Sequence, residues 1–248
     1  MPKSTMSTTL NYSPNFDVKK RKVKELKFII FHYTGMKKEN QAITRLTNTK
    51  SKVSSHYLIK NNGEILTLVP DLYIAWHAGV SSWKNYKSIN KYSIGIEISN
   101  PGHEYFYKKF SKKQIKSILK LSTYLRKKYK IKSNFILGHS DIAPDRKKDP
   151  GEKFPWKYLS KNKIGHWHNL NEKKLFKKRN QIVDKLEKNI FIKNLYKLGY
   201  PKNILFNKYK YSKLLITAFQ RRFRQELVNG IIDQECLFIS NNLAKNMK

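Results

Sequence analysis

Three residues able to bind a metal follow short, stiff segments of this sequence. His32 closes an apolar run, His139 follows Gly138 at the end of a second apolar run, and Asp149 stands directly before Pro150. Two imidazoles and one carboxylate can hold a metal ion through three ligands and leave one position open. On Zn²⁺ the open position holds a water, so this set favours hydrolysis over a purely structural role.

A carboxylate, Glu97, lies within the apolar segment 94–98. Because side chains alternate along a strand, Gly95, Glu97 and Ser99 share one face and the isoleucines share the other. Gly95 leaves room beside Glu97, and a carboxylate with a raised pKa is suited to take a proton from a metal-bound water. An ordinary glutamate on a solvated sheet face fits the local sequence equally well.

Lys147 stands two residues before Asp149, so in an extended loop both side chains point to one side. An ammonium group beside a metal would stabilise the oxyanion of a tetrahedral intermediate. Lysine occurs throughout the chain, and Lys148 is the next residue. A solvated surface lysine is therefore the competing interpretation of Lys147.

Two further histidines are candidates for the lining of a substrate cleft. His56 precedes a predicted strand, and His77 lies in a loop of small residues. Buried polar groups are usually hydrogen-bonded, so a satisfied structural histidine is the alternative at both positions. His166 and His168, which flank Trp167, indicate a domain interface rather than a metal site.

Alternating strand and helix patterns predict an α/β domain with a central mixed β-sheet flanked by helices. An Asn62-Gly63 turn between two apolar runs is a strong hairpin signal, because glycine supplies the positive φ that such a turn needs. The expected strands are 27–33, 56–60, 64–69, 93–99 and 134–137, and the expected helices are 40–48 and 114–128.

The composition changes after residue 168, and the apolar pattern becomes helical. Three helices are expected between residues 189 and 246, with Pro201 just beyond the first and Asp233 capping the third. We therefore expect an irregular N-terminal arm at 1–24, a catalytic domain at 25–168, a linker at 169–188 and a small three-helix domain at 189–246.

The 248 residues carry a net charge of +35, which attracts polyanions such as nucleic acid or an anionic cell-wall polymer. No base-reading motif accompanies the lysines, and codon bias explains their even spread, so no specific nucleic-acid partner is predicted. The single cysteine, Cys236, excludes an intrachain disulfide, and no apolar run is long enough for a transmembrane segment. The N-terminus lacks an apolar signal segment, which indicates the cytoplasm, another export route or a trimmed signal.

Several motifs occur in the order and spacing of a known family. They are Phe31-His32-Tyr33-Thr34, Ser55-His56-Tyr57-Leu58-Ile59, Trp76-His77-Ala78-Gly79, Ile94-Gly95-Ile96-Glu97-Ile98, Gly138-His139-Ser140-Asp141-Ile142-Ala143-Pro144 and Arg146-Lys147-Lys148-Asp149-Pro150-Gly151. From about residue 25 to residue 167 the chain resembles the zinc-dependent N-acetylmuramoyl-L-alanine amidases of the type 2 amidase family, which are related to peptidoglycan recognition proteins.

The resemblance implies specific roles for the residues singled out above. It assigns the zinc to His32, His139 and Asp149, proton transfer to Glu97 and transition-state stabilisation to Lys147. It also supports His77 as a cleft residue.

The C-terminal region resembles a peptidoglycan-binding module in the segments 195–200, 218–223 and 229–233. Such a module is typical of envelope amidases, so the resemblance favours the bacterial cell envelope or periplasm. A cytoplasmic location is the alternative, because no signal peptide is visible.

These observations predict a hydrolase that cleaves the amide between N-acetylmuramic acid, possibly in its anhydro form, and L-alanine of a peptidoglycan stem peptide. Two other classes compete with it. One is a wall sensor that binds peptidoglycan or muropeptides without cleaving them, and the other is a nucleic-acid-binding protein. The complete ligand set together with Glu97 favours the enzyme, because non-catalytic relatives typically lose a ligand.

Overall fold

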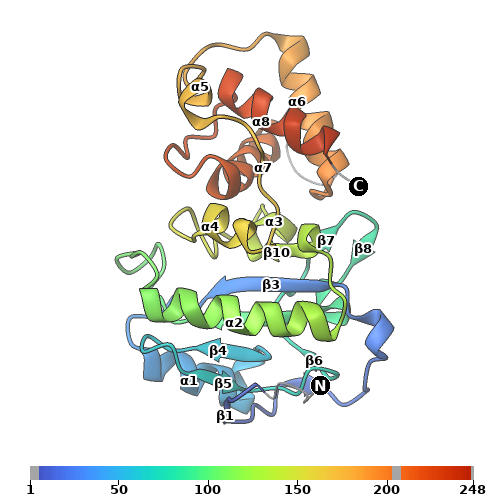
Figure 1. Cartoon of the computed structure of the whole chain (residues 1–248). Helices are drawn as coiled ribbons and strands as arrows, with labels where there is room; N and C mark the ends of the chain where they lie inside the picture. The colour runs from blue at the N-terminus through green and yellow to red at the C-terminus, as the bar shows by residue number, and fades with distance from the viewer. Residues whose placement is uncertain (1–5, 203–207, 247–248) are drawn as a thin grey trace.

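The computed structural model describes residues 6–202 and 208–246, so the first five residues of the predicted arm lie outside the described part (Figure 1). A six-stranded sheet has the order β1-β5-β4-β9-β3-β10, and neighbouring strands are parallel except β4 and β5. The sheet is therefore mixed, as predicted. Its strands are β1 (Thr9–Leu10), β3 (Phe28–Tyr33), β4 (Tyr57–Ile59), β5 (Ile65–Thr67), β9 (Ser93–Ile98) and β10 (Ile136–Gly138).

The strongest local signals are confirmed. β4 and β5 form the predicted antiparallel hairpin, and Gly63 in its turn has φ +86°. The two predicted helices are α1 (Glu39–Thr47) and α2 (Lys112–Lys128). α2 begins where Ser111 accepts a hydrogen bond from the backbone of Gln114, whose side chain accepts one from Ser111 in return.

The prediction of an irregular N-terminal arm is wrong for residues 9–10 and 16–17. β1 pairs in parallel with β5, and β2 (Phe16–Asp17) pairs with β6 (Ile74–Ala75). Edge strands this short are held by backbone hydrogen bonds, so they need no apolar run that a sequence pattern could detect.

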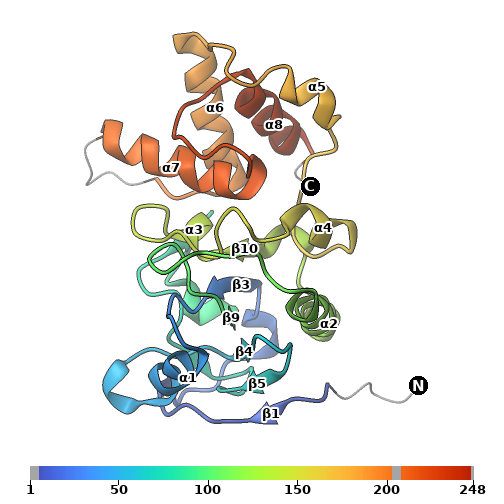
Figure 2. The same ribbon diagram turned by 90° about the vertical axis from the view of Figure 1, so that its left-hand side faces the viewer.

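Helices cover the two faces of the sheet (Figure 2). On one face, Ile118, Leu121 and Leu125 of α2 lie in a buried cluster with the isoleucines of β9. On the other face, Leu46 of α1 packs with Leu58 and leucines of β5 and the segment after it. The alternation predicted for β9 is therefore correct, and Glu97 points away from α2.

The C-terminal unit contains the three predicted helices α6 (Lys185–Leu198), α7 (Lys208–Phe223) and α8 (Gln234–Lys245). Asp233 caps α8 by accepting a hydrogen bond from Cys236 N at 2.9 Å, as predicted. The predicted linker 169–188 holds the short helix α5 (Glu172–Phe176) and the first turn of α6. The remaining elements that bear on the site are β7 (Ser82–Trp83), β8 (Tyr86–Lys87), α3 (His139–Ile142) and α4 (Trp156–Lys161).

One buried cluster joins the two parts of the chain. It contains Phe28 and Ile30 of β3 together with Phe191, Leu195 and Phe219 of the C-terminal helices. Figure 1 shows the C-terminal helices beyond β10, α3 and α4, and Trp167 packs on Phe223 with ring centroids 5.8 Å apart. In the described ranges, no helix is long and apolar enough to cross a membrane.

Candidate metal centre

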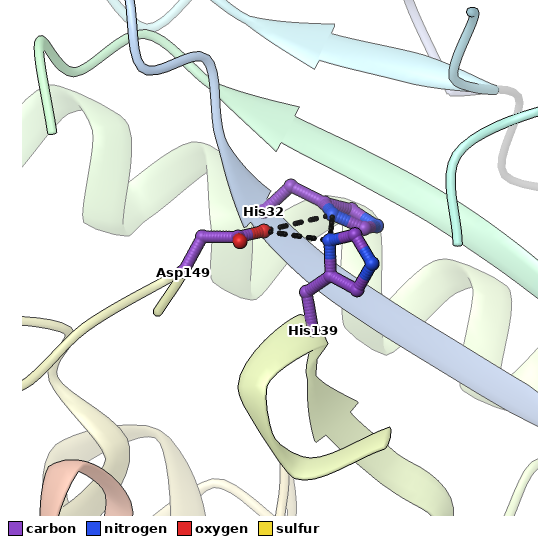
Figure 3. Close-up of side chains that lie close together, drawn as sticks. All are labelled: His32, His139 and Asp149. Carbon is purple, nitrogen blue, oxygen red and sulfur yellow. Dashed lines mark hydrogen bonds and ion pairs between the residues drawn. The ribbon is translucent and has the colours of Figure 1, made fainter. Parts of the chain in front are cut away.

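His32, His139 and Asp149 converge on one point (Figure 3). The two Nδ1 atoms are 3.0 Å apart, and Asp149 Oδ2 lies 3.0 Å from that of His32 and 3.1 Å from that of His139. The three side chains are buried. Three donor atoms drawn from distant parts of the chain thus form a nearly equilateral triangle.

The outer nitrogen of His139 has a fixed partner. His139 Nε2 lies 3.1 Å from the carbonyl oxygen of Ala78, which can only accept a hydrogen bond. The proton of a neutral His139 therefore resides on Nε2, and Nδ1 presents a lone pair to the centre.

The outer nitrogen of His32 is fixed through a short chain of hydrogen bonds. The Ser93 hydroxyl donates to the Ile89 carbonyl at 2.7 Å, so at 3.1 Å it accepts from His77 Nε2. His77 Nδ1 then carries no proton and accepts from His32 Nε2 at 3.0 Å. His32 Nδ1 is left with a lone pair that faces the centre.

With both imidazoles neutral, the triangle presents two lone pairs and a carboxylate with no proton among them. The two lone pairs and the carboxylate oxygen would repel one another at these distances, and a cation bound between them would remove the repulsion. For a tetrahedral Zn²⁺ with bonds of about 2.0–2.1 Å, ligand atoms should be about 3.3 Å apart, close to the separations found. Each imidazole also has the outer hydrogen bond typical of a metal ligand. The residues present therefore fit a metal ion.

The charges agree with this arrangement. Burial and the neighbouring His139 lower the pKa of His32 to about 4, which keeps its imidazole neutral at pH 7. Burial alone would raise the pKa of Asp149, but the charge and the hydrogen bonds that the two imidazoles offer when they carry a proton outweigh it and hold that pKa well below its usual value, so Asp149 is ionised. A neutral His32 and an ionised Asp149 are the states in which these two groups bind a metal.

The sheet places the three ligands. His32 lies near the carboxyl end of β3, beside Glu97 in the register of β9. His139 is the first residue of α3, directly after β10. Ser140 N donates to the backbone oxygen of Asp149 at 2.8 Å, so a backbone hydrogen bond ties the loop that carries Asp149 to α3.

Glu97 is half-buried, and its Oε2 atom has no hydrogen-bond partner in the described part of the chain. Burial raises the pKa of this carboxyl to about 8, and the negative charge of Asp149 adds to the rise. A carboxyl with a pKa near neutrality is suited to accept and return a proton.

A hollow of about 750 Å³ opens above the three ligands and is also lined by Glu97 and Lys147. The Lys147 ammonium lies close enough to lower the pKa of both Glu97 and His32. The structure thus brings together the residues that the sequence predicted for metal binding, proton transfer and charge stabilisation.

The two cleft candidates lie in different places. His77 lines the hollow, but Cβ on Gly95 would lie 2.4 Å from its Cγ, so the room at Gly95 belongs to this imidazole. His56 does not line the hollow: it is 0% exposed, accepts from Gly95 N and contacts the guanidinium of Arg21 at 2.9 Å. His56 is therefore a buried structural residue, because every polar atom of its ring is already bonded within the protein.

Sequence reasoning did not find Ser93 or the carbonyl of Ala78, which fix the imidazole protons. Ser93 begins β9 without any local signal, and a backbone carbonyl has no residue type to read. Both roles depend on contacts between segments far apart in the chain.

Comparison with known proteins shows the family of this chain. Residues 22–152 match the family described as N-acetylmuramoyl-L-alanine amidase. The N-acetylmuramoyl-L-alanine amidase AmiD of Escherichia coli is 32% identical over 232 residues, which cover 89% of this chain and 83% of AmiD. The 1,6-anhydro-N-acetylmuramyl-L-alanine amidase AmpD of Haemophilus influenzae is 40% identical over 111 residues, 44% of this chain and 58% of that protein.

Solved structures give the same result. The structure of AmiD of E. coli in complex with the substrate anhydro-N-acetylmuramic acid-L-Ala-D-γ-Glu-L-Lys matches this structure with a TM-score of 0.79. The match covers 89% of this chain and 89% of AmiD. AmpDh3 of Pseudomonas aeruginosa is 27% identical with a TM-score of 0.77, and the match covers 99% of this chain and 97% of AmpDh3. The chain therefore belongs to the N-acetylmuramoyl-L-alanine amidase family.

Proposed function

We propose that this protein is a zinc-dependent amidase that hydrolyses the amide between N-acetylmuramic acid and the L-alanine of a peptidoglycan stem peptide. The observation that carries the proposal is the centre itself. Three side chains able to bind a metal lie beside the carboxyl of Glu97, and all of them line an open hollow. Family membership supplies the reaction class, and the His-His-Asp donor set favours zinc.

His32, His139 and Asp149 would hold the ion. A zinc ion held there would supply Lewis acidity, which activates water for attack at a pH of about 7. Glu97 takes the proton of the attacking water and returns it to the leaving amine. Lys147 places a positive charge at the mouth of the centre, where the carbonyl oxygen becomes negative.

The charges of the hollow support a carboxylate-bearing muropeptide as substrate. Lys37, Arg45 and Arg146 line it along with Lys147 and Lys148, whereas its carboxylates besides Asp149 are Glu97 and Glu104. A stem peptide carries free carboxylates, which this excess of cations attracts. An anhydro-muropeptide is the substrate of the related AmiD complex, and we propose the same class for this chain.

We further propose that residues 25–168 act as the catalytic domain and that 189–246 serve as a peptidoglycan-binding domain joined by the segment 169–188. Such a role would place the enzyme at the bacterial cell envelope. Cell fractionation followed by immunoblotting checks the location, and recovery only in the cytoplasmic fraction would contradict it.

The reaction is tested with purified muropeptides. Mass spectrometry should detect free stem peptide after incubation with the protein, and a chelator should stop its release until zinc is restored. The matched variant Glu97→Ala should retain one zinc per chain and release almost no peptide. Binding of muropeptides without any release would instead favour a non-catalytic sensor of peptidoglycan.

A further inference from the structure

A buried carboxylate, Asp141, connects the metal centre to the C-terminal helices. It lies in α3 two residues after His139 and is 1% exposed. Its Oδ2 accepts a hydrogen bond from Gly138 N at 2.8 Å and forms an ion pair with Arg222 of α7. Its Oδ1 accepts from the hydroxyl of Tyr200 at 2.8 Å. Two of its three donors thus come from the C-terminal unit.

Both terminal nitrogens of the Arg222 guanidinium bond to the catalytic part. Besides the ion pair with Asp141, its Nη2 donates to the Ile136 carbonyl of the edge strand β10 at 3.0 Å. The guanidinium also lies 4.3 Å from the ring centroid of Trp156 in α4. Since Arg222 is only 3% exposed, removal of either partner would leave a buried charge without compensation.

Tyr200 contacts the same region from the end of α6. Its ring packs on Trp83 with centroids 4.9 Å apart, while its hydroxyl reaches Asp141. Arg222 and Tyr200 therefore bond to Asp141 of α3 from two separate segments of the C-terminal unit.

α3 is one turn long, and a single turn cannot fix its own orientation. It nevertheless carries His139 as its first residue and holds the Asp149 loop through the hydrogen bond from Ser140 N at 2.8 Å. A displacement of α3 would therefore move two of the three ligands. The contacts that hold α3 in place therefore determine the positions of His139 and Asp149 around a metal.

We propose that Arg222 and Tyr200 are positioning residues for the metal centre, which act through Asp141 and α3. The C-terminal helices then hold the ligand geometry in addition to any contact with the cell wall. This inference rests on the proposed function, because it requires a metal at His32, His139 and Asp149.

The test compares Arg222→Met with Arg224→Met in the full-length protein. Arg224 is a matched control, since it is 2% exposed and paired with Asp233, and its hydrogen bonds stay within the C-terminal unit. Competition with a chromophoric chelator measures the zinc Kd of each folded variant. Arg222→Met should bind zinc about 10-fold more weakly, in the range found when the support of a metal ligand is lost, and Arg224→Met should stay within about twofold of wild type.

If Arg222→Met does not fold, a second pair of variants, each of which removes a single hydroxyl group, tests the proposal. Tyr200→Phe removes only the hydroxyl that reaches Asp141, whereas Ser240→Ala removes a buried hydroxyl that donates to Leu237 O within the C-terminal unit. Tyr200→Phe should weaken zinc binding by about threefold, the effect of one lost hydrogen bond, and Ser240→Ala should not. Wild-type zinc affinity in Tyr200→Phe and in any folded Arg222→Met, or equal losses in the controls, would overturn the proposal.

A double variant tests whether Arg222 acts through Asp141. If Arg222 acts through Asp141, the losses in Asp141→Asn and Arg222→Met should not add in the combined variant. Additive losses would contradict that route. A wild-type protein that binds no zinc would refute the proposed function instead, so the two failures are distinguishable.

Discussion

At the scale of single residues, the centre depends on where protons reside. The Ala78 carbonyl and the Ser93–His77 pair hold the outer protons of both imidazoles, so the inner nitrogens present lone pairs. Neutral imidazoles and an ionised carboxylate are the protonation states that a metal needs. Without a metal ion, the carboxyl of Glu97, nearby on the next strand, retains its proton to about pH 8. The positive charge of a bound metal ion would lower this pKa and leave the carboxylate able to accept a proton.

Replacement of Glu97 tests its role as proton acceptor. Glu97→Gln should lower kcat about 10²–10⁴-fold and keep one zinc per chain, because the amide preserves shape but cannot accept the proton. Steady-state kinetics and metal analysis measure the two quantities. Glu104→Gln is the control, since Glu104 lines the same hollow but is largely exposed and paired with Lys148 at 3.6 Å. Comparable losses in both variants would remove the specific role.

The pKa of Glu97 also predicts how the stability of the metal-free protein depends on pH. The folded-state pKa, about 8, exceeds the unfolded value, so between roughly pH 4.5 and pH 8 the folded state binds more protons. The free energy of unfolding should therefore fall as the pH rises, by up to about 1.4 kcal/mol per pH unit from this group.

Urea unfolding in the presence of a chelator measures this contribution as the difference between wild type and Glu97→Gln. The difference isolates Glu97 from the buried histidines, whose lowered pKa values act in the opposite direction below about pH 6.5. Parallel curves for the two proteins would contradict a raised pKa at Glu97.

At the scale of elements, β9 separates two environments. Ile94, Ile96 and Ile98 face α2, whereas Gly95 and Glu97 face the metal centre. The glycine is required by the imidazole of His77, which occupies the space where a Cβ would lie. One face of the strand thus packs in the core against α2. The other face leaves space for His77, which accepts the hydrogen bond from His32.

A methyl group at position 95 should disturb that support. Gly95→Ala is expected to displace His77, to cost about 1–3 kcal/mol of stability and to weaken zinc binding about 10-fold or more. Ser99→Ala, directly after this strand, is the control, because the buried Ser99 hydroxyl makes no hydrogen bond in the described structure. Thermal unfolding and chelator competition give both quantities. Unchanged zinc affinity in Gly95→Ala would show that His77 does not support His32.

At the scale of the whole molecule, the metal should contribute to stability as a ligand of the folded state. At a free zinc concentration 100 times the Kd, binding should stabilise the protein by about 2.7 kcal/mol, because the ligands are assembled only by folding. For a chain of this size, removal of zinc should lower the Tm by roughly 5–11 °C. Calorimetry with and without a chelator measures the shift, and His139→Ala should abolish it.

The two parts of the chain are held together by apolar burial and by the Asp141–Arg222 pair. Sequence patterns identified the helices of the C-terminal unit and the cap at Asp233, because amphipathic spacing and capping are local properties. They did not reveal the joint core, since an apolar residue does not specify which distant residue it will meet.

The sequence by itself determined the mixed sheet, the hairpin at Gly63, the face of β9 that carries Glu97 and the candidate ligands His32, His139 and Asp149. Strand alternation, turn chemistry and ligand type can all be read from neighbouring residues.

Only the tertiary structure decided the contacts between distant segments. It placed His56 against Arg21 and away from the hollow, paired part of the arm with β5, and set the imidazole protons through Ala78 and Ser93. These features depend on which backbone and side-chain groups meet when the chain is compact, and no local pattern encodes such pairings.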